Sequence, residues 1–230
     1  MVKQMRVLCV AGAVLLWSTA YAGTVILPGL SSGLQVDVQS FKEQRFSSVI
    51  QQQYDFSCGS AAIASLLSYH YDHEVTEQKV FSGMFSLADP EKVRMEGFSM
   101  LDMKRFLESE GYQADGFRMP LSGLRKKVSL PVIVLLNLNG FRHFVVIKGI
   151  SDDEVYVGDP ARGLKVYSRV AFERYWNGAA FVIRSHLEQG RRTFLADGGW
   201  PQIVRAPLFK GQEGPPLGHT LPHWPQMREW

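Results

Sequence analysis

The sequence of 230 residues has little cysteine, almost no net charge and no hydrophobic run long enough to span a bilayer comfortably. Its formal net charge is +3, and the 25 basic residues are scattered, which argues against a nucleic-acid partner. The composition also excludes collagen-like, coiled-coil and wholly disordered chains. The hydrophobic content of 46% is typical of a globular protein with one ordinary core.

The first 22 residues have the pattern of a secretory signal peptide. Lys3 and Arg6 precede an apolar run over residues 7–17, and the small-residue exit Ala20-Tyr21-Ala22 follows. We therefore predict cleavage after Ala22 and export to the periplasm, with no stable transmembrane segment left in the mature chain. An uncleaved membrane anchor is the alternative.

Cleavage would remove Cys9 and leave Cys58 as the one cysteine of the mature chain. Exported proteins usually pair their thiols, so an odd cysteine indicates either a reactive thiol or a partner in another molecule. A buried cysteine that packs as a small hydrophobe is the other interpretation. The count alone leaves both open.

The mature chain changes character along its length. Six of the eleven prolines lie between Pro201 and Pro225, where no apolar periodicity is present. The aromatic residues Trp200, Phe209, Trp224 and Trp230 indicate that parts of this region dock on a surface, such as the protein's own core. We predict four segments: a signal peptide (1–22), an N-terminal strand segment (23–43), a catalytic domain (44–186) and a proline-rich C-terminal extension (187–230).

Within the domain, helical patterns come first and strand patterns follow, which predicts an α+β fold with N-terminal helices packed on an antiparallel β-sheet. Thr76 and Ser99 are predicted helix N-caps, and Asn139-Gly140 is a predicted tight turn between two strands. The expected helices cover 58–71, 76–85, 99–111, a short stretch from 122, and 171–176. The expected strands cover 131–138, 141–150, 154–157, 165–167 and 179–183.

Cys58 opens the first predicted helix of the domain. A thiol in that position faces unpaired backbone N–H groups and the positive end of the helix dipole, and both favour the nucleophilic thiolate. Gly59, which follows it, is expected to let a substrate backbone approach closely.

His143 and Asp159 are predicted to meet across a hairpin. The midpoint between them is residue 151, where a turn is expected, so the two side chains would lie directly opposite, with Cβ atoms roughly 5 Å apart. If the register of the hairpin slipped by two residues, the two side chains would still be within reach of each other. A carboxylate beside an imidazole fixes its tautomer and stabilises the imidazolium. The structural alternatives are a satisfied core histidine, an ordinary Asp-Pro turn and, at Gln52, a solvated loop amide.

Three blocks of sequence together resemble the C39 peptidases, a family of papain-like cysteine proteases. Gln52 stands six residues before Cys58-Gly59, and the blocks 142–146 and 157–160 carry the histidine and the aspartate with the family's spacing. The resemblance extends over roughly residues 44–184.

The resemblance implies Cys58 as nucleophile, His143 as base and then acid, Asp159 as the group that orients the histidine, and Gln52 as an oxyanion-hole donor. It implies a peptide or protein substrate and no cofactor. The best-known members are fused to transporters, whereas this chain is similar to stand-alone exported members, among them proteases of functional-amyloid secretion. Components of a secretion system are therefore possible partners, and the family's double-glycine rule is in doubt.

Two other functions remain open at this point. Transglutaminase-like acyl transferases use the same order of Cys, His and Asp, and a papain-like cleft could hold an exported chain without cutting it. Isopeptide formation and the labelling rate of Cys58 would separate these from a peptidase.

Two further patterns are weak. His70 and His73, with Asp72 and Glu74 nearby, are too loosely spaced to indicate a metal site, so none is predicted. Gly198-Gly199 is a possible site of self-cleavage by Cys58.

Overall fold

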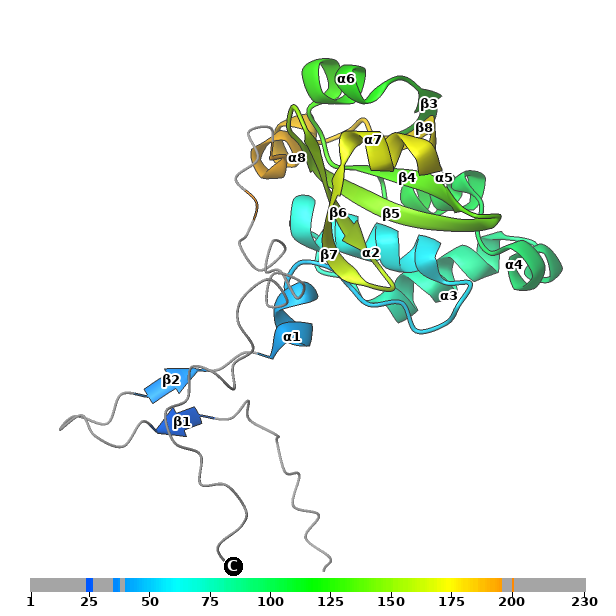
Figure 1. Cartoon of the computed structure of the whole chain (residues 1–230). Helices are drawn as coiled ribbons and strands as arrows, with labels where there is room; N and C mark the ends of the chain where they lie inside the picture. Colours follow the sequence, from blue (N-terminus) through cyan, green and yellow to red (C-terminus); the bar gives the residue numbers. More distant parts are fainter. Residues whose placement is uncertain (1–23, 27–34, 38–39, 196–199, 201–230) are drawn as a thin grey trace, which may run out of the picture. The chain divides into compact units, whose positions relative to one another are not determined.

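The computed structural model describes residues 24–26, 35–37, 40–195 and 200 (Figure 1). The chain divides into one unit that ends at Ser40 and a second that starts at Phe41. In the first unit, strands β1 (Thr24–Ile26) and β2 (Gln35–Asp37) pair antiparallel. The predicted signal peptide (1–22) lies outside the described residues.

The second unit begins with helices and continues with strands, so the predicted α+β class is confirmed. The helices are α1 (Phe41–Arg45), α2 (Cys58–His70), α3 (Glu77–Leu87), α4 (Pro90–Glu96), α5 (Met100–Ser109), α6 (Leu121–Gly123), the π-helix η1 (Leu124–Val128), α7 (Arg169–Tyr175) and α8 (Leu187–Thr193). The strands are β3 (Ala114–Arg118), β4 (Val132–Leu138), β5 (Phe141–Ile150), β6 (Glu154–Asp159), β7 (Gly163–Ser168) and β8 (Trp176–Ile183).

The six strands form one antiparallel sheet in the order β3-β8-β4-β5-β6-β7. Helices α2, α3 and α5 lie on one face, and α7 lies on the other (Figure 1). Ile133 and Val146 pack toward the first layer of helices, whereas their neighbours Val134 and Val145 pack toward the second. Because both faces of the central strands are covered, their sequences are continuous apolar runs instead of alternating ones.

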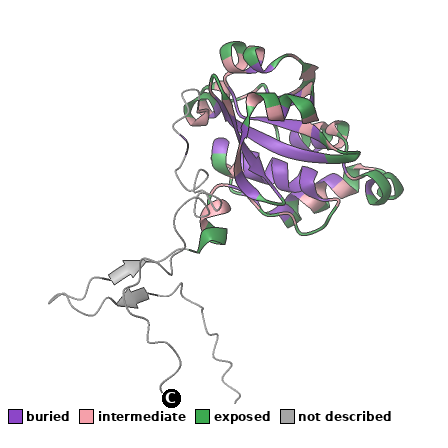
Figure 2. Ribbon diagram, viewed as in Figure 1, coloured by how far each residue is buried: buried purple, intermediate pink, exposed green. Residues whose placement is uncertain are grey.

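Burial follows the same layers (Figure 2). Helix α2 and the central strands are buried along most of their length, whereas α4 exposes most of its residues. Among the described residues, no helix is long and apolar enough to cross a membrane.

Local signals in the sequence set several boundaries. Thr76 accepts a hydrogen bond from the Lys79 N–H at the start of α3, and Ser99 forms a reciprocal capping box with Asp102 at the start of α5. Asn139 and Gly140 both have positive φ, 56° and 96°, as a tight hairpin turn of this kind requires. These three predictions are confirmed.

The β5–β6 hairpin differs from the prediction in register. Val146 pairs with Gly158, which is a shift of two residues from the expected register, so His143 and Asp159 are not directly opposite. The reason is a turn centred beyond residue 151, which pairs Ile150 with Val155 and shifts the register by three residues. A β-bulge between Ile147 and Gly149 then reduces this shift to two. A bulge adds one residue to one strand only, and the apolar pattern of β5 does not show it.

The C-terminal part of the described chain packs on this bulge. Leu195 forms a parallel bridge with Gly149, and Trp200 is 5% exposed and stacks on Tyr156. A Cβ atom at Gly149 would overlap the Leu195 carbonyl oxygen and the Trp200 ring, so only glycine fits. Helix α8 (Leu187–Thr193) was not predicted. Trp200 therefore docks on the protein's own core, whereas Phe209, Trp224 and Trp230 lie outside the described residues.

Candidate active site

Cys58 is the first residue of α2, and the residue is 7% exposed. The residue before it, Ser57, makes no side-chain hydrogen bond to the start of the helix. The first N–H groups of an α-helix have no partner within the helix. The sulfur therefore lies at the end of the helix where unpaired backbone N–H groups and the positive end of the helix dipole meet.

Gly59 has a packing role that differs from the prediction. A Cβ atom there would lie 2.8 Å from Met103 Cε and 3.3 Å from Phe98 Cβ. The residue thus faces α5 and the loop before it, inside the protein. The expectation that Gly59 makes room for a substrate backbone is wrong, because the space beside it is already filled by these two side chains.

His143 and Asp159 are in direct contact despite the shifted register. His143 Nε2 lies 2.7 Å from Asp159 Oδ1, and both side chains are buried. The other ring nitrogen, Nδ1, is buried and has no hydrogen-bond partner among the described residues. Since Nε2 is occupied by the carboxylate, Nδ1 is the nitrogen that remains to exchange a proton with another group.

The surroundings of the imidazole favour its charged form. Burial by itself would lower the pKa of His143, but the hydrogen bond with Asp159 and the neighbouring Cys58 side chain raise the pKa to about 9. At neutral pH the imidazole is therefore protonated. An imidazolium beside a sulfur stabilises the sulfur anion, so His143 and Cys58 can form an ion pair.

Asp159 is held as a carboxylate by hydrogen bonds. Its Oδ1 accepts the backbone N–H groups of Ala161 and Arg162 at 2.9 and 3.2 Å, in addition to the contact with His143. Burial by itself would raise the pKa of Asp159, but these hydrogen bonds outweigh it, and the pKa lies below its usual range. The Asp-Pro turn thus serves to orient the carboxylate toward the imidazole.

Gln52 lies in the loop before α2 and is tied to the same turn. Its backbone N–H donates to the Pro160 carbonyl at 3.0 Å, and its side-chain Nε2 donates to the Tyr54 carbonyl at 2.9 Å. Its Oε1 is buried without a partner. This amide is therefore not a freely solvated loop group, and one of its two N–H bonds remains available.

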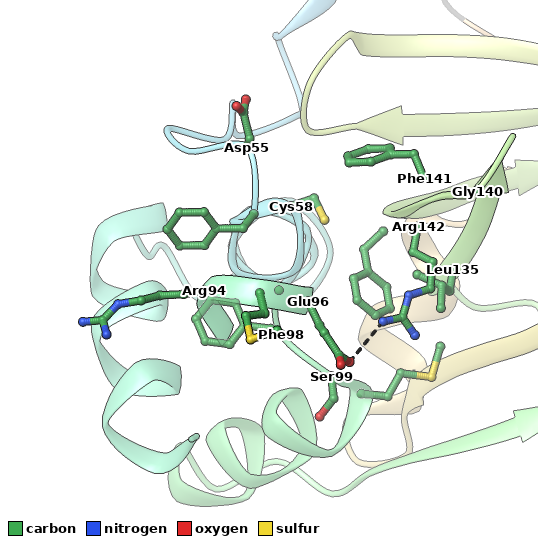
Figure 3. A pocket seen from close by; sticks show the side chains of 15 residues that line it. Asp55, Cys58, Arg94, Glu96, Phe98, Ser99, Leu135, Gly140, Phe141 and Arg142 are labelled. Carbon is green, nitrogen blue, oxygen red and sulfur yellow. Dashed lines mark hydrogen bonds and ion pairs between the residues drawn. The ribbon is translucent and has the colours of Figure 1, made fainter. Parts of the chain in front are cut away.

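A cavity of about 570 Å³ opens beside Cys58. In Figure 3 the sulfur points toward this space, with Phe141 on its far side, and an ion pair joins Glu96 to Arg142 at 3.3 Å. The cavity lies between the α4–α5 loop and the start of β5, and its wall is mainly apolar. Aromatic and aliphatic members of the wall are Phe56, Phe98, Met100, Leu135, Phe141 and Phe144.

The loosely spaced histidines have partners of their own. His70 Nδ1 lies 2.8 Å from the Thr193 hydroxyl, and His73 Nδ1 lies 3.1 Å from the Tyr112 hydroxyl. In the part of the chain that the structure describes, no group of three or more His, Cys, Asp or Glu side chains is arranged to hold a metal ion.

The sequence did not indicate the cavity wall. Phe98 lies in the loop before α5, Met100 is the first residue of α5 and Arg142 lies in β5. Their proximity to Cys58 depends on how α5 and the β4–β5 hairpin pack. Phe98 is buried, as a core residue would be. A local apolar pattern does not distinguish the inside of a core from the wall of a cavity.

A cysteine at a helix start, a cavity beside it and a histidine held by a carboxylate on the following sheet define a papain-like cysteine peptidase. Residues 47–188 match the Peptidase C39 family. The chain belongs to this family of cysteine peptidases, as its sequence blocks predicted. The family match supports peptide hydrolysis over the transglutaminase-like alternative.

Two curated relatives are similar over most of the chain. The probable functional amyloid protease FapD of Pseudomonas aeruginosa is 44% identical over 181 residues, which cover 78% of this chain and 80% of that protein. FapD of Pseudomonas fluorescens is 42% identical over 171 residues, which cover 74% and 75%. The chain is thus a FapD-like cysteine peptidase.

Two solved structures share the fold. A double glycine motif protease from an AMS/PCAT transporter, in complex with the leader peptide, has a TM-score of 0.51 and 28% identity over 59% of this chain and 89% of that one. The peptidase domain of Streptococcus ComA has a TM-score of 0.50 and 20% identity, and covers 59% of this chain and 96% of that one. The second likeness concerns the fold alone.

Proposed function

We propose that this chain is an exported peptidase that cuts a protein of a functional-amyloid secretion system, with Cys58 as nucleophile and His143 as general acid and base. One observation carries the proposed chemistry. The His143–Asp159 pair is buried, measures 2.7 Å and neighbours a thiol at the mouth of a 570 Å³ cavity. A structural histidine needs neither the thiol nor the cavity.

In the first half of the reaction, the Cys58 thiolate attacks the carbonyl carbon of the scissile peptide bond and forms a C–S bond. The carbonyl electron pair moves to oxygen and gives a tetrahedral oxyanion. When this intermediate collapses, the C–N bond breaks and the His143 imidazolium gives its proton to the departing amine. A thioester between Cys58 and the substrate's acyl group remains.

In the second half, neutral His143 takes a proton from water while the water oxygen attacks the thioester carbon. The second tetrahedral intermediate collapses with cleavage of the C–S bond, which releases the carboxylic acid product and restores the thiolate beside the imidazolium. Asp159 keeps the ring oriented and stabilises its charge in both halves, and it exchanges no proton.

The oxyanion would form beside the start of α2. The backbone N–H of Cys58 and the free N–H of the Gln52 amide are the donors that we assign to it. One such donor lowers the activation free energy by about 3 kcal/mol in hydrolases of this kind. The hydrogen bond from Gln52 to Tyr54 supports this role, because it holds the amide in one orientation.

The substrate is proposed from the cavity and from the relatives. The apolar wall beside Cys58 suits a peptide segment with a large apolar side chain, and a relative of 28% identity binds a leader peptide. The FapD relatives are named for functional amyloid. Export rests on the signal-peptide pattern of residues 1–22, and N-terminal sequencing of the protein from a periplasmic extract should start at Gly23.

The activity is tested by comparing terminal peptides of exported proteins from a host that carries either the wild-type chain or Cys58→Ala. The variant should accumulate at least one uncleaved exported protein, and the purified wild type should cut that protein in vitro. His143→Gln should also be inactive, whereas His73→Gln, which changes a histidine bound to Tyr112, should be active. Identical terminal peptides in all strains, or a fully active Cys58→Ala, would contradict the proposal.

Intact mass spectrometry of the same proteins tests self-cleavage at Gly198-Gly199, which lies outside the described residues. A C-terminal truncation in the wild type that is absent from Cys58→Ala would support it, and equal full-length masses would exclude it.

A further inference from the structure

Ser57 stands directly before the nucleophile, and its side chain is completely buried. Serine at the start of a helix usually caps it by accepting a hydrogen bond from a backbone N–H of the first turn. Thr76, Ser99 and Ser168 do so at the starts of α3, α5 and α7. Ser57 does not, and its backbone (φ −98°, ψ 14°) is outside the extended region that a capping residue adopts.

The Ser57 hydroxyl is directed backward along the chain instead. Its Oγ accepts the Tyr54 backbone N–H at 3.1 Å and donates to the Tyr54 carbonyl at 3.0 Å. The Ser57 backbone N–H also donates to that carbonyl at 3.1 Å. The main chain of Tyr54 is thus fixed relative to the first residue of α2, although the Tyr54 side chain is exposed.

The same Tyr54 carbonyl accepts the side-chain Nε2 of Gln52 at 2.9 Å. Only the NH₂ end of an amide can donate to a carbonyl, so this contact decides which way the Gln52 amide faces. It also explains why Oε1 of Gln52 is buried without a partner. Three residues therefore form a continuous chain of hydrogen bonds from the helix start to the proposed oxyanion donor.

The diverted hydroxyl has a second effect at the helix itself. Because Ser57 caps nothing, the N–H groups of Cys58 and Gly59 have no side-chain acceptor among the described residues. A serine in the usual capping geometry would compete with an oxyanion for donors of this first turn. The geometry of Ser57 thus leaves those donors available and holds the Gln52 amide at the same time.

We propose that Ser57 is a positioning residue for the oxyanion site, which acts on the substrate through Tyr54 and Gln52 without touching it. This inference rests on the proposed function, because it needs Cys58 to be the nucleophile. It gives the serine before Cys58 a role in transition-state stabilisation that is separate from the reactivity of the thiolate.

Two small probes separate stabilisation of the oxyanion from reactivity of the Cys58 thiolate. p-Nitrophenyl acetate acylates a thiolate through a tetrahedral oxyanion, whereas iodoacetamide alkylates it by direct displacement and forms no oxyanion. Both depend on the Cys58 thiolate, and neither depends on the unknown peptide substrate. The ratio of the acylation rate to the alkylation rate therefore reports the oxyanion site alone.

In the full mature chain, Ser57→Ala should lower the acylation rate about tenfold, which corresponds to one hydrogen bond, and leave the alkylation rate within about twofold. Ser68→Ala is the matched control. Ser68 Oγ likewise accepts the backbone N–H of one residue, Val75, and contacts the carbonyl oxygen of the same residue, but at the other end of α2. It also lies 3.5 Å from the His73 carbonyl oxygen. The control should leave both rates unchanged.

The decisive comparison is a double-mutant cycle. Gln52→Ala should lower acylation about a hundredfold, and the double variant with Ser57→Ala should be no slower, because Ser57 acts through Gln52. Additive losses would overturn the inference. So would an equal loss of acylation and alkylation in Ser57→Ala, or failure of this variant to fold, since the hydroxyl would then hold the helix start as a whole.

Failure of the proposed function and failure of the role of Ser57 give different experimental results. If Cys58→Ala is still acylated and alkylated at the wild-type rates, the proposed function is wrong. If Cys58 reacts as expected but Ser57→Ala leaves the ratio unchanged, only the role of Ser57 is wrong.

Discussion

His143 and His70 are each 3% exposed, yet their surroundings move their pKa values in opposite directions. The pKa of His143 is raised to about 9, and the pKa of His70 lies well below the ordinary value of 6.5. Burial acts alike on both, since a buried imidazole loses the hydration of its charged form. The difference must come from their neighbours.

His143 has a carboxylate and a thiol beside it, namely Asp159 and Cys58. For His70, burial is the larger cause of the lowered pKa and the positive charge of Lys148 is the second, while its hydrogen-bond partner is the uncharged Thr193. One histidine is thus kept charged and can donate a proton at neutral pH, whereas the other is neutral and structural. Burial alone does not make an acid–base catalyst.

Asp159→Asn should produce the largest change, because it makes the surroundings of His143 resemble those of His70. We expect turnover to fall about a thousandfold or more, with the fold retained, since an amide cannot stabilise the imidazolium. NMR titration should show the pKa of His143 lowered. Asp153→Asn, in the exposed turn of the same hairpin, is the control and should be fully active. A variant with near-normal turnover would remove Asp159 from the mechanism.

The pH dependence of peptide turnover should show the raised pKa of His143. Above about pH 9 the imidazole loses the proton needed by the leaving amine, and kcat/KM should fall about tenfold per pH unit. The free energy of unfolding should change with pH in the same direction as the turnover rate. The folded pKa exceeds 6.5, so the stabilisation is complete below that pH and is lost as pH rises through about 9. A rate that stays level to pH 10.5 would contradict this.

Lys148→Met tests the surroundings of His70, because it removes the positive charge of Lys148 near this histidine. Burial lowers the pKa of Lys148 from 10.5 to about 7, so folding disfavours the ammonium. This cost is complete below pH 7 and disappears as pH rises toward 10.5. Relative to the variant, the wild type should therefore gain up to about 1.4 kcal/mol of unfolding free energy per pH unit in that window. Parallel stability curves from pH 6 to 10 would exclude a buried, titrating Lys148.

Thr193→Val should have the smallest effect. It removes the hydroxyl that contacts His70 Nδ1 at 2.8 Å and should lower the unfolding free energy by about 1 kcal/mol in urea denaturation. Turnover should be unchanged, because His70 takes no part in the proposed reaction. Thr76→Val, which removes the N-cap of α3, provides a stability change of similar size away from His70. A large loss of activity in Thr193→Val would show that the two histidines are coupled.

Contacts between residues that are close in sequence, or that one turn brings together, were predictable. The contact between His143 and Asp159 could be predicted from a turn between two strands. The predicted register was wrong by two residues, but side chains offset by two residues across a hairpin still reach each other. The caps at Thr76 and Ser99 depend on local hydrogen bonds, and they also agreed with the structure.

Features that depend on packing were not predictable. The bulge in β5 was hidden by a continuous apolar run, and α4 and β3 escaped notice because one is mostly exposed and the other is a short edge strand with Asp115 and Arg118. The role of Gly59 was misjudged because its neighbours come from the loop before α5 and from α5 itself. A serine directly before a helix usually caps it, and only the structure shows that the Ser57 hydroxyl points to the Tyr54 carbonyl instead.

The bridge between Leu195 and Gly149 also has a consequence for the order of assembly. The Leu195 N–H and carbonyl bind Lys148 and Ile150 on β5, and Trp200 closes the apolar cluster behind them. A ribosome makes Cys58, His143 and Asp159 well before it makes these two residues. The chain thus contains all three of these residues before it gains the contact at the end of β5, beyond the last residue of β5 that pairs with β4.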